Sequence, residues 1–371
     1  MQGGTLQDQQ WMMRALSHAR RGEIGTAPNP RVGCILVRDG REIAHGWHAR
    51  VGEAHAEAAA LDAIPHNQSP VGATAYVTLE PCSHHGRTPP CSDALISAGI
   101  SRCVVGTTDP NPVISGRGLD RMRSAGIEVT LMDAFPEGRW LNRRFLSSME
   151  RNRPWIVLKC AVSADGFMDP PRRHGEKGSL SITSPALRRL THRWRAEEGA
   201  ILVGSGTVIT DDPELNVREA EGPDPLRIVM DLRGRTTPTA KAYGPSSPTL
   251  VLGGPANLPP HVSRLSPRQG NGYSDLMDAL QQRDVRSVLV EGGADTLHGF
   301  LEAELWDELR ICRSNQSVGG GLAAPEWPNE ETALLRGHHP FGSDTVEYRV
   351  HKQSAEWVGM AFPPTLSIPL P

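Results

Sequence analysis

A histidine, a glutamate and two cysteines in the first hundred residues have the side chains of a metal-dependent hydrolytic site. His55 and Glu57 are separated by one alanine, and Cys82 and Cys91 follow later in the chain. One imidazole and two thiolates suit Zn²⁺ and leave its fourth tetrahedral position for water, as a catalytic site requires. These residue types predict a catalytic zinc site with His55, Cys82 and Cys91 as the metal ligands.

Glu57 has the right type and position for an acid–base role. Because it stands two residues after the histidine, we expect its carboxylate to reach the water rather than the metal. Zinc brings the pKa of water close to neutrality, and Glu57 would pass that proton to a ring nitrogen and a departing amine. The order H-x-E, then P-C and a second cysteine, is typical of zinc-dependent base deaminases. In this chain the second cysteine follows nine residues after the first, not three.

Two other interpretations of these residues remain open from the sequence. His55 and the two cysteines are unrelated in space, or they hold a purely structural zinc whose fourth ligand is His84 or His85. The remaining cysteines lie in apolar, strand-like runs, where a cysteine is usually a small buried hydrophobic side chain. These are Cys34, Cys103, Cys160 and Cys312.

The elements that must position this site alternate between strands and helices. Asp39-Gly40 between two apolar runs is a strong signal for a hairpin. The pattern predicts strands over 32–37, 41–46, 73–79, 102–106 and 127–131, and helices over 54–64, 91–98 and 116–125. An amphipathic helix is expected at the N-terminus, with Trp11, Ala15, Leu16 and Ala19 on one side. Together they predict one layered α/β domain.

The second half of the chain restarts the alternation after a polar stretch at 147–154. We expect two domains, 1–149 and 150–371, with residues 313–371 poorly assigned. Strands are predicted over 155–160, 200–204, 226–231, 249–252, 287–291, 307–312 and 345–350. Loops rich in proline and glycine are expected over 168–180 and 253–272.

Two glycine-bearing turns in this half follow buried strands. Gly204 and Gly206 follow the strand at 200–204, and Gly292 and Gly293 follow the strand at 287–291. Glycine at such a turn lets backbone N–H groups approach an anion at a helix N-terminus. Neither turn has the G-x-G-x-x-G pattern of a Rossmann nucleotide site, and a tight turn without a ligand is an equally good interpretation of each.

The first half resembles the deaminase domain of the bifunctional riboflavin-biosynthesis deaminase–reductase family. The resemblance rests on LEPCSHHGRTPPC, with its long spacing between the cysteines, and on TAPNPRVGCILVRDG, GWH and TTDPNP. It implies a cytidine-deaminase-like three-layer domain. It also implies a pyrimidine and phosphoribosyl pocket lined by Asn29, His48, His84, Arg87, Asp109 and Asn111.

The second half resembles the reductase half of the same family, which is an α/β domain like dihydrofolate reductase and uses NADPH. The matching pieces include RPWIVLKCAVSADG, ITS, TDDPELNVR and VLVEGG. The resemblance implies cofactor contacts at Ala161, Ser181, Thr207, Asp211, Gly293, Ala294, Asp295, Thr296, Leu297, His298 and Gly299. It implies substrate contacts at Ser179, Arg195, Leu215, Arg218 and Glu291. Ser181 stands where the family usually has a tryptophan.

The resemblance implies two successive reactions on one phosphoribosylated diaminopyrimidine. The zinc site would hydrolyse an exocyclic amine, and the second domain would then use NADPH to reduce the ribosyl chain to ribityl. Three alternatives remain: a deaminase with an inactive reductase domain, a nucleic-acid or free-nucleotide cytidine deaminase, and a non-catalytic binding protein. The reductase resemblance also leads us to expect a homodimer or a higher homo-oligomer.

Composition argues against several other classes of protein. The 371 residues carry a formal net charge of −3 and 5% aromatic residues, which gives no support to a nucleic-acid partner. No apolar run reaches the length of a transmembrane helix, and the first residues lack the order of a secretory signal. We therefore expect a cytoplasmic enzyme with a small-molecule substrate and neither a membrane nor a nucleic-acid partner.

Overall fold

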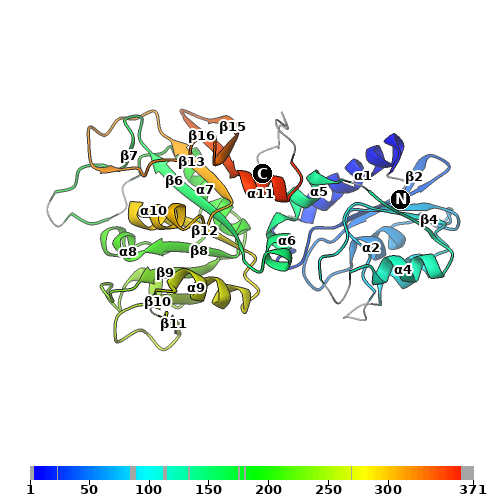
Figure 1. Cartoon of the computed structure of the whole chain (residues 1–371), viewed down its shortest axis with the longest axis horizontal. Helices are drawn as coiled ribbons and strands as arrows, with labels where there is room; N and C mark the ends of the chain where they lie inside the picture. The colour runs from blue at the N-terminus through cyan, green and yellow to red at the C-terminus, as the bar shows by residue number, and fades with distance from the viewer. Residues whose placement is uncertain are drawn as a thin grey trace. The chain divides into compact units, whose positions relative to one another are not determined.

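The computed structural model describes residues 4–22, 24–83, 89–111, 115–132, 134–173, 176–178, 181–268 and 270–360. The chain divides into two compact units, Met1–Arg151 and Asn152–Pro371 (Figure 1). Each unit has its own sheet and its own hydrophobic clusters. The sequence-based boundary, between residues 149 and 150, falls two residues before this division.

The first unit contains five strands among its described residues. They are β1 (Gly33–Arg38), β2 (Arg41–Trp47), β3 (Thr74–Val77), β4 (Arg102–Val105) and β5 (Glu128–Leu131). The helices are α1 (Leu6–Ala19), the 3₁₀ turn η1 (Arg20–Gly22), α2 (Ala56–Asp62), α3 (Cys91–Ser97), α4 (Arg117–Ser124), α5 (Pro136–Leu141) and α6 (Arg143–Glu150).

Helices cover both faces of this sheet, whose strand order is β2-β1-β3-β4-β5. Strand β1 pairs antiparallel with β2 and β3, whereas β3, β4 and β5 are parallel. One face packs against apolar side chains of α2, α3 and α4, and the other against those of α1 and α5. The three-layer arrangement predicted from the sequence is confirmed.

Two features of the first unit depend on local backbone geometry: the turn between β1 and β2, and the packing of α2 against β2. Asp39 and Gly40 both have positive φ (51° and 72°), as a two-residue hairpin between β1 and β2 requires. Gly46 in β2 lies directly under α2, because a Cβ on Gly46 would meet the backbone of Ala60 at 2.4 Å and that of Ala56 at 2.5 Å. Helix α2 is thereby held close against the sheet.

The second unit contains a larger sheet. The nine strands of this sheet are β6 (Trp155–Val162), β8 (Ala200–Gly204), β9 (Leu226–Asp231), β10 (Thr249–Gly253), β11 (Val262–Leu265), β12 (Ser287–Gly292), β13 (Glu308–Arg313), β15 (Ala333–Phe341) and β16 (Asp344–His351). Strands β7 (Phe167–Asp169) and β14 (Leu322–Ala323) form a separate two-stranded sheet. Its helices are α7 (Pro185–Glu197), α8 (Ser205–Asp211), the 3₁₀ turn η2 (Lys241–Tyr243), α9 (Gly272–Gln281), α10 (Ala294–Glu302) and α11 (Lys352–Trp357).

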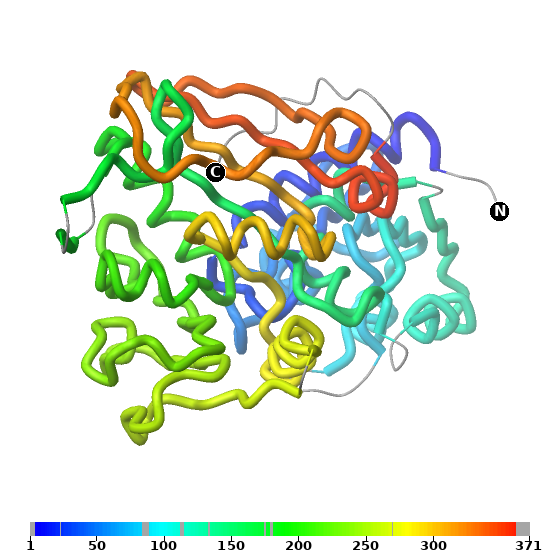
Figure 2. Tube along the Cα trace, turned by 60° about the vertical axis from the view of Figure 1, so that its left-hand side comes forward, coloured from blue at the N-terminus to red at the C-terminus, as the bar shows by residue number. Residues whose placement is uncertain are grey.

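The nine-stranded sheet has the order β11-β10-β9-β8-β12-β6-β13-β16-β15. All neighbouring strands from β11 to β13 are parallel, and β16 and β15 extend the sheet as an antiparallel hairpin. Figure 2 shows this last hairpin, in orange and red, returning beside earlier strands. Apolar residues of α9 and α10 form the largest cluster with the sheet, whereas Val208 of α8 belongs to a second cluster.

The strand predictions of both halves are confirmed to within three residues at each end. The prediction of a loop over 253–272 is wrong for the four residues of β11, because the prolines on both sides of this short strand favour a loop. Strand β15, in the poorly assigned C-terminal region, was not predicted. It contains Gly337 and Pro340, which are unfavourable in strands, and it pairs only with β16 at the edge of the sheet.

Candidate functional site

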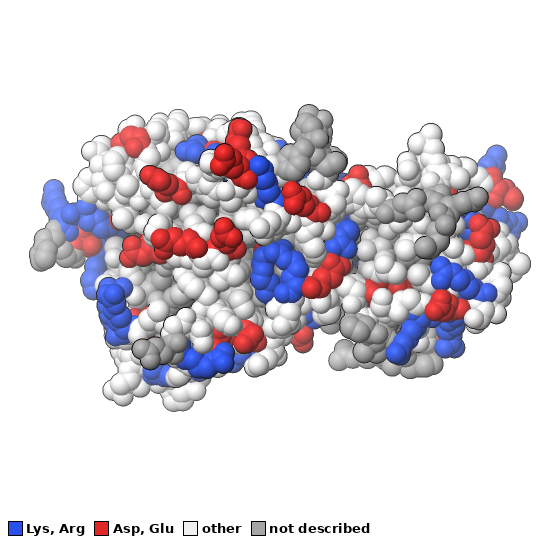
Figure 3. Space-filling view, in the orientation of Figure 1, with Lys and Arg blue, Asp and Glu red and all other residues white. Residues whose placement is uncertain are grey.

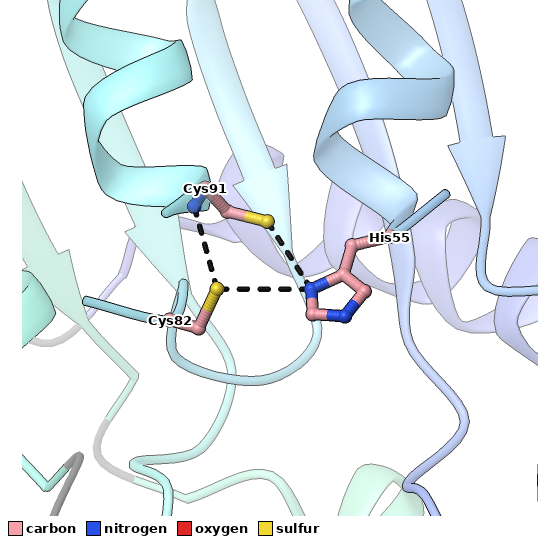
Figure 4. Close-up of side chains that lie close together, drawn as sticks. All are labelled: His55, Cys82 and Cys91. Carbon is pink, nitrogen blue, oxygen red and sulfur yellow. Dashed lines mark hydrogen bonds between the residues drawn. The ribbon is translucent and has the colours of Figure 1, made fainter. Parts of the chain in front are cut away.

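Three separate elements bring the predicted metal ligands together. His55 is the N-cap residue of α2, Cys91 is the first residue of α3, and Cys82 lies in the loop after β3. Figure 4 shows the three side chains pointing toward one another. Ser83, directly after Cys82, is not helical, and 84–88 lie outside the described residues.

The distances between these side chains fit a zinc ion. His55 Nδ1 is 3.7 Å from Cys82 Sγ and 3.4 Å from Cys91 Sγ. All three ligand atoms lie within 4.8 Å of one another. In a tetrahedral site with Zn–S near 2.3 Å and Zn–N near 2.1 Å, a sulfur and a nitrogen ligand are about 3.6 Å apart. The donor set and its spacing therefore match this metal.

The two thiols are electrostatically unequal. The hydrogen bond with Cys91 lowers the pKa of Cys82 to about 4, and His55 and the backbone N–H of Cys91, 3.3 Å from Cys82 Sγ, act in the same direction. The same contact and burial raise the pKa of Cys91. The shared hydrogen bond therefore favours the thiolate at Cys82 over that at Cys91, and metal binding requires both thiols to lose their protons.

Glu57 is buried directly beside the ligands. It lies in the first turn of α2 and is 3% exposed. Burial, together with the negative charge on Cys82, raises the pKa of Glu57 to about 7, although hydrogen bonds and His55 oppose this shift. A dication in the site would lower this pKa again. The carboxyl therefore lies where it can exchange a proton with a water at this site, and its pKa depends on whether the metal is bound.

Asn29 and His48 form a hydrogen-bonded pair next to His55. Burial lowers the pKa of His48, so its ring is neutral at pH 7. The carbonyl of Ala54 lies 3.1 Å from His48 Nδ1, and a carbonyl only accepts, so Nδ1 carries the hydrogen. His48 Nε2 then accepts from Asn29 Nδ2 at 3.3 Å. The rings of His48 and His55 meet edge to face at 5.4 Å.

Asp109 and Asn111 form a local turn in the segment after β4. The N–H of Asn111 donates to Asp109 Oδ1 at 2.9 Å. The buried carboxylate of Glu80, which our sequence reasoning did not single out, accepts from the N–H of Asp109 at 3.3 Å. His84 and Arg87, the other expected pocket residues of this unit, lie outside the described residues.

A second group of potential ligands within the described ranges comprises His18, Glu42 and His45. Arg14 pairs with Glu42 at 2.6 Å, which supplies a positive charge where a metal would be needed. The rings of His18 and His45 stack with centroids 3.9 Å apart and planes 18° apart. Because ring-nitrogen lone pairs lie in the ring planes, stacked rings do not direct them to one point. The His55 group is the better metal site.

The two glycine-bearing turns of the second unit lie side by side, because β8 and β12 are adjacent parallel strands. A Cβ on Gly204 would lie 2.3 Å from Thr296 Oγ1, and a Cβ on Gly293 would lie 3.2 Å from Thr207 Oγ1. The hydroxyl of Thr207 also donates to the carbonyl of Gly292 at 3.3 Å. The N-termini of α8 and α10 therefore lie close together at the carboxyl ends of β8 and β12.

The expected substrate residues of this unit include a buried ion pair. Arg195 donates to both carboxylate oxygens of Glu291, from Nε and a terminal nitrogen, at 2.7 Å each. Arg195 lowers the pKa of Glu291 to about 2 against the effect of burial. Leu215 is buried with a φ of 55°, and Arg218 donates to Asn216 Oδ1 at 3.0 Å. Ser179 lies outside the described residues.

The expected cofactor residues differ in what their side chains contact. Leu297 is fully buried in the core, and a Cβ on Gly299 would meet the Tyr273 hydroxyl at 2.3 Å. Asp211 pairs with Arg172 at 2.9 Å, a partner that our sequence reasoning missed because it lies in an irregular loop. The exposed Ser181 donates to the carbonyl of Thr183.

The remaining residues of this set lie near the end of β6 or on α10. Ala161 lies in β6 opposite Cys312 of β13, and Ala294 and Asp295 lie in the first turn of α10. His298 faces Glu302 at 3.1 Å on the exposed side of the helix. The side chains of Leu297 and His298 thus contact other partners and Gly299 has no side chain, so a cofactor at this turn would be bound mainly through backbone groups.

The four cysteines interpreted as structural are all buried in strands, as predicted. They are Cys34 in β1, Cys103 in β4, Cys160 in β6 and Cys312 in β13. On the face shown in Figure 3, both positive and negative side chains occur over each unit, without a continuous positive band across the coloured residues. No helix in the described part of the chain has the length and apolarity needed to cross a membrane.

Comparison with known families matches each half of the chain separately. The sequence model of the cytidine and deoxycytidylate deaminase zinc-binding region matches residues 5–107. The sequence model of the RibD C-terminal domain matches residues 154–345.

Relatives match nearly the whole chain. The riboflavin biosynthesis protein RibD of Escherichia coli (strain K12) is 41% identical over 333 residues, covering 85% of this chain and 89% of that protein. RibD of Haemophilus influenzae is 39% identical over 330 residues, covering 84% and 87%.

Solved structures extend the match to the fold. The diaminohydroxyphosphoribosylaminopyrimidine deaminase/5-amino-6-(5-phosphoribosylamino)uracil reductase of Thermotoga maritima has a TM-score of 0.82 at 34% identity, covering 93% of this chain and 99% of that one. Acinetobacter baumannii RibD has a TM-score of 0.82 at 34% identity, covering 94% and 99%. The predicted fold, a cytidine-deaminase-like domain followed by a dihydrofolate-reductase-like domain, is confirmed.

Proposed function

The chain belongs to the RibD family of riboflavin biosynthesis proteins, and we propose that it catalyses two successive steps on one phosphoribosylated pyrimidine. It combines a zinc-binding deaminase domain with an NADPH-dependent reductase domain. The proposed substrate is 2,5-diamino-6-ribosylamino-4(3H)-pyrimidinone 5′-phosphate. The convergence of His55, Cys82 and Cys91 beside the buried Glu57 is the observation that supports the first step most strongly.

In the deaminase unit, His55, Cys82 and Cys91 would hold the zinc ion. Bound there, zinc would supply the positive charge that makes water acidic enough to act as a nucleophile near neutral pH. Glu57 would take one proton from the attacking water and deliver it to the ring nitrogen, and would then carry the remaining hydroxyl proton to the departing amine. Glu57 is 3% exposed in the first turn of α2, directly beside His55, which suits a group that must reach the water at this site.

The pyrimidine would lie against the polar residues beside this site. Asn29, His48, Asp109 and Asn111 can pair with the edge of a polar heterocycle, and His84 and Arg87 complete the proposed pocket. The neutral His48 accepts from the Asn29 amide nitrogen, which fixes the orientation of that amide. Arg87 would bind the phosphate, for which a guanidinium has a matching geometry.

In the reductase unit, NADPH would supply the hydride for C1′ of the ribosyl chain. The paired turns at Gly204 and Gly293 place two helix N-termini together, where backbone N–H groups favour a phosphate. Arg195, oriented by Glu291, and Arg218 would bind the phosphorylated substrate. Thr207, Asp211, Ser181 and the segment from Gly293 to Gly299 would contact the cofactor.

We also propose that the protein works in the cytoplasm as a homodimer or a higher homo-oligomer. The RibD relatives are enzymes of a biosynthetic pathway, and the substrate class consists of phosphorylated small molecules. The interspersed charges in Figure 3 give no basis for a nucleic-acid partner on that face.

The test is to supply the diamino substrate to zinc-loaded protein with and without NADPH, and to follow ammonia and NADPH oxidation separately. We expect ammonia release in both cases, and NADPH oxidation only after the amine has been lost. Ammonia release without NADPH consumption would contradict the proposed reductase activity, and would instead support a deaminase with an inactive second domain. Absence of ammonia would contradict the first step.

A further inference from the structure

Glu80 is a buried carboxylate for which the proposed chemistry has no role. It is 4% exposed and stands two residues before the ligand Cys82, just after β3. Its backbone N–H donates to the carbonyl of Thr107 at 2.9 Å, which ties it to the segment that follows β4. A buried carboxylate is costly unless its oxygens are hydrogen-bonded, so the partners of this side chain are informative.

Backbone N–H groups from both ends of one loop bind the Glu80 carboxylate. Oε2 accepts from Asp109 at 3.3 Å and from Gly116 at 3.0 Å, and Oε1 accepts from Gly118 at 3.2 Å. Gly116 and Gly118 lie at the start of α4, where the helix dipole favours a negative charge. Glu80 therefore closes the loop between Asp109 and α4.

A second contact links this loop to the metal ligand. A Cβ on Gly118 would lie 2.1 Å from the carbonyl oxygen of Pro81, the residue between Glu80 and Cys82. The first turn of α4 thus lies directly on the backbone that leads to Cys82. A change in the position of Glu80 would therefore move this loop relative to the backbone of Pro81 and Cys82.

We propose that Glu80 is a positioning residue that sets the substrate affinity of the deaminase site by holding Asp109 and Asn111 beside Cys82. This inference rests on the proposed function, which places Asp109 and Asn111 in the pyrimidine pocket. Asp109 is itself shaped by the loop, because its Oδ1 accepts from the N–H of Asn111 at 2.9 Å. Glu80 acts only through this loop and takes no part in proton transfer.

Glu80→Gln is the most direct test, because it keeps the size of the side chain. The amide has one acceptor oxygen, and its NH₂ group would face a backbone N–H that now binds a carboxylate oxygen. We expect the KM for deamination to rise at least tenfold while kcat changes less than threefold. Zinc content should stay at one per chain, and reductase activity should not change.

Asp8→Asn is the matched control in the same unit. Asp8 is also a buried carboxylate, 2% exposed, which accepts from the N–H of Thr5 and pairs with Arg102. Its loss should lower the melting temperature and leave the deaminase KM unchanged. If Glu80 were merely structural, Glu80→Gln would behave in the same way. Glu80→Asp, which keeps the charge, should recover part of the affinity.

Gly118→Ala provides an independent variant should Glu80→Gln not fold, because it leaves Glu80 intact and separates α4 from Pro81. It should raise the KM in the same way. An unchanged KM in a folded, zinc-loaded variant of either kind would overturn the proposal. Absence of ammonia release by the wild-type protein is a different result, since it would overturn the proposed function itself.

Discussion

At the scale of single residues, Glu57 is the side chain whose proposed chemistry is easiest to isolate. Glu57→Gln keeps the shape of a buried group and removes its ability to carry the proton. We expect kcat for deamination to fall by about 10²- to 10⁴-fold, the range typical of a lost general acid–base. Zinc content should remain at one per chain. The exposed Glu53→Gln, in the loop before His55, should keep full activity in the same ammonia assay.

A pair of matched variants can also distinguish a zinc-binding cysteine from a cysteine that is only buried. Cys91→Ala removes one thiolate from the proposed site, so the purified protein should contain well below one zinc per chain after dialysis against a chelator. Cys103→Ala is the matched control, because Cys103 is fully buried in β4 and belongs to the hydrophobic cluster. It should retain zinc, and equal zinc loss in both variants would contradict the ligand assignment.

The residue types and spacing of His55, Glu57, Cys82 and Cys91 were enough to predict the metal site, because zinc chemistry limits the usable side chains. The role of Glu80 was not visible in the sequence. Its hydrogen-bond donors are backbone N–H groups about thirty or more residues later, and any residue type can provide them. Such a contact is determined by the fold and leaves no residue pattern to recognise.

At the scale of elements, the deaminase site depends on how closely α2 approaches β2. Gly46→Ala would place a Cβ within 2.5 Å of the α2 backbone, so the helix that begins at His55 must shift. We expect a loss of about 1–3 kcal/mol in unfolding free energy, as is usual for overpacking, together with reduced ammonia release. Thermal unfolding and the activity assay measure the two effects.

Gly206→Ala is the control for the glycine substitution itself. Gly206 lies in α8 of the other unit, where a Cβ would have nothing within 4 Å among the described atoms. Alanine favours a helix over glycine, so this variant should unfold at the wild-type temperature or slightly above it and should release ammonia normally. Full deaminase activity in Gly46→Ala would contradict the account of α2.

Helices and strands with a clear hydrophobic pattern and clear turn residues at their ends were predictable from the sequence. The hairpin at Asp39-Gly40 and the buried strands β8 and β12 follow from local residue preferences. Strand β15 follows instead from pairing with β16, which compensates for its glycine and proline. Tertiary context overrides local preference there, and a single sequence does not show it.

At the scale of the whole molecule, stability should fall in mild acid. His192 of the second unit is 1% exposed, and burial, with the nearby Arg195 and Arg218, lowers its pKa from 6.5 to about 4. Between these values the unfolded chain binds a proton that the folded chain does not, so unfolding becomes easier as the pH falls. The unfolding free energy should therefore drop by about 2–3 kcal/mol between pH 6.5 and 4.

His192→Gln should reduce this pH dependence, which thermal unfolding of the second unit at several pH values would measure. The exposed His338→Gln is the matched control and should keep the wild-type slope. Because the proposed zinc ligands all lie in the first unit, metal release does not enter this comparison. Equal slopes in wild type and His192→Gln would show that His192 does not contribute.

The proposed zinc site of the whole enzyme is tested most directly by titrating zinc-free protein with Zn²⁺ while ammonia release from the diamino substrate is followed. Three ligand atoms within 4.8 Å of one another, beside one buried carboxyl, make up the one metal site that we propose for the deaminase unit. We predict that the rate rises in proportion to added zinc and stops rising at one zinc per chain. Ammonia release by the zinc-free protein, or a rate that does not respond to zinc, would contradict this prediction.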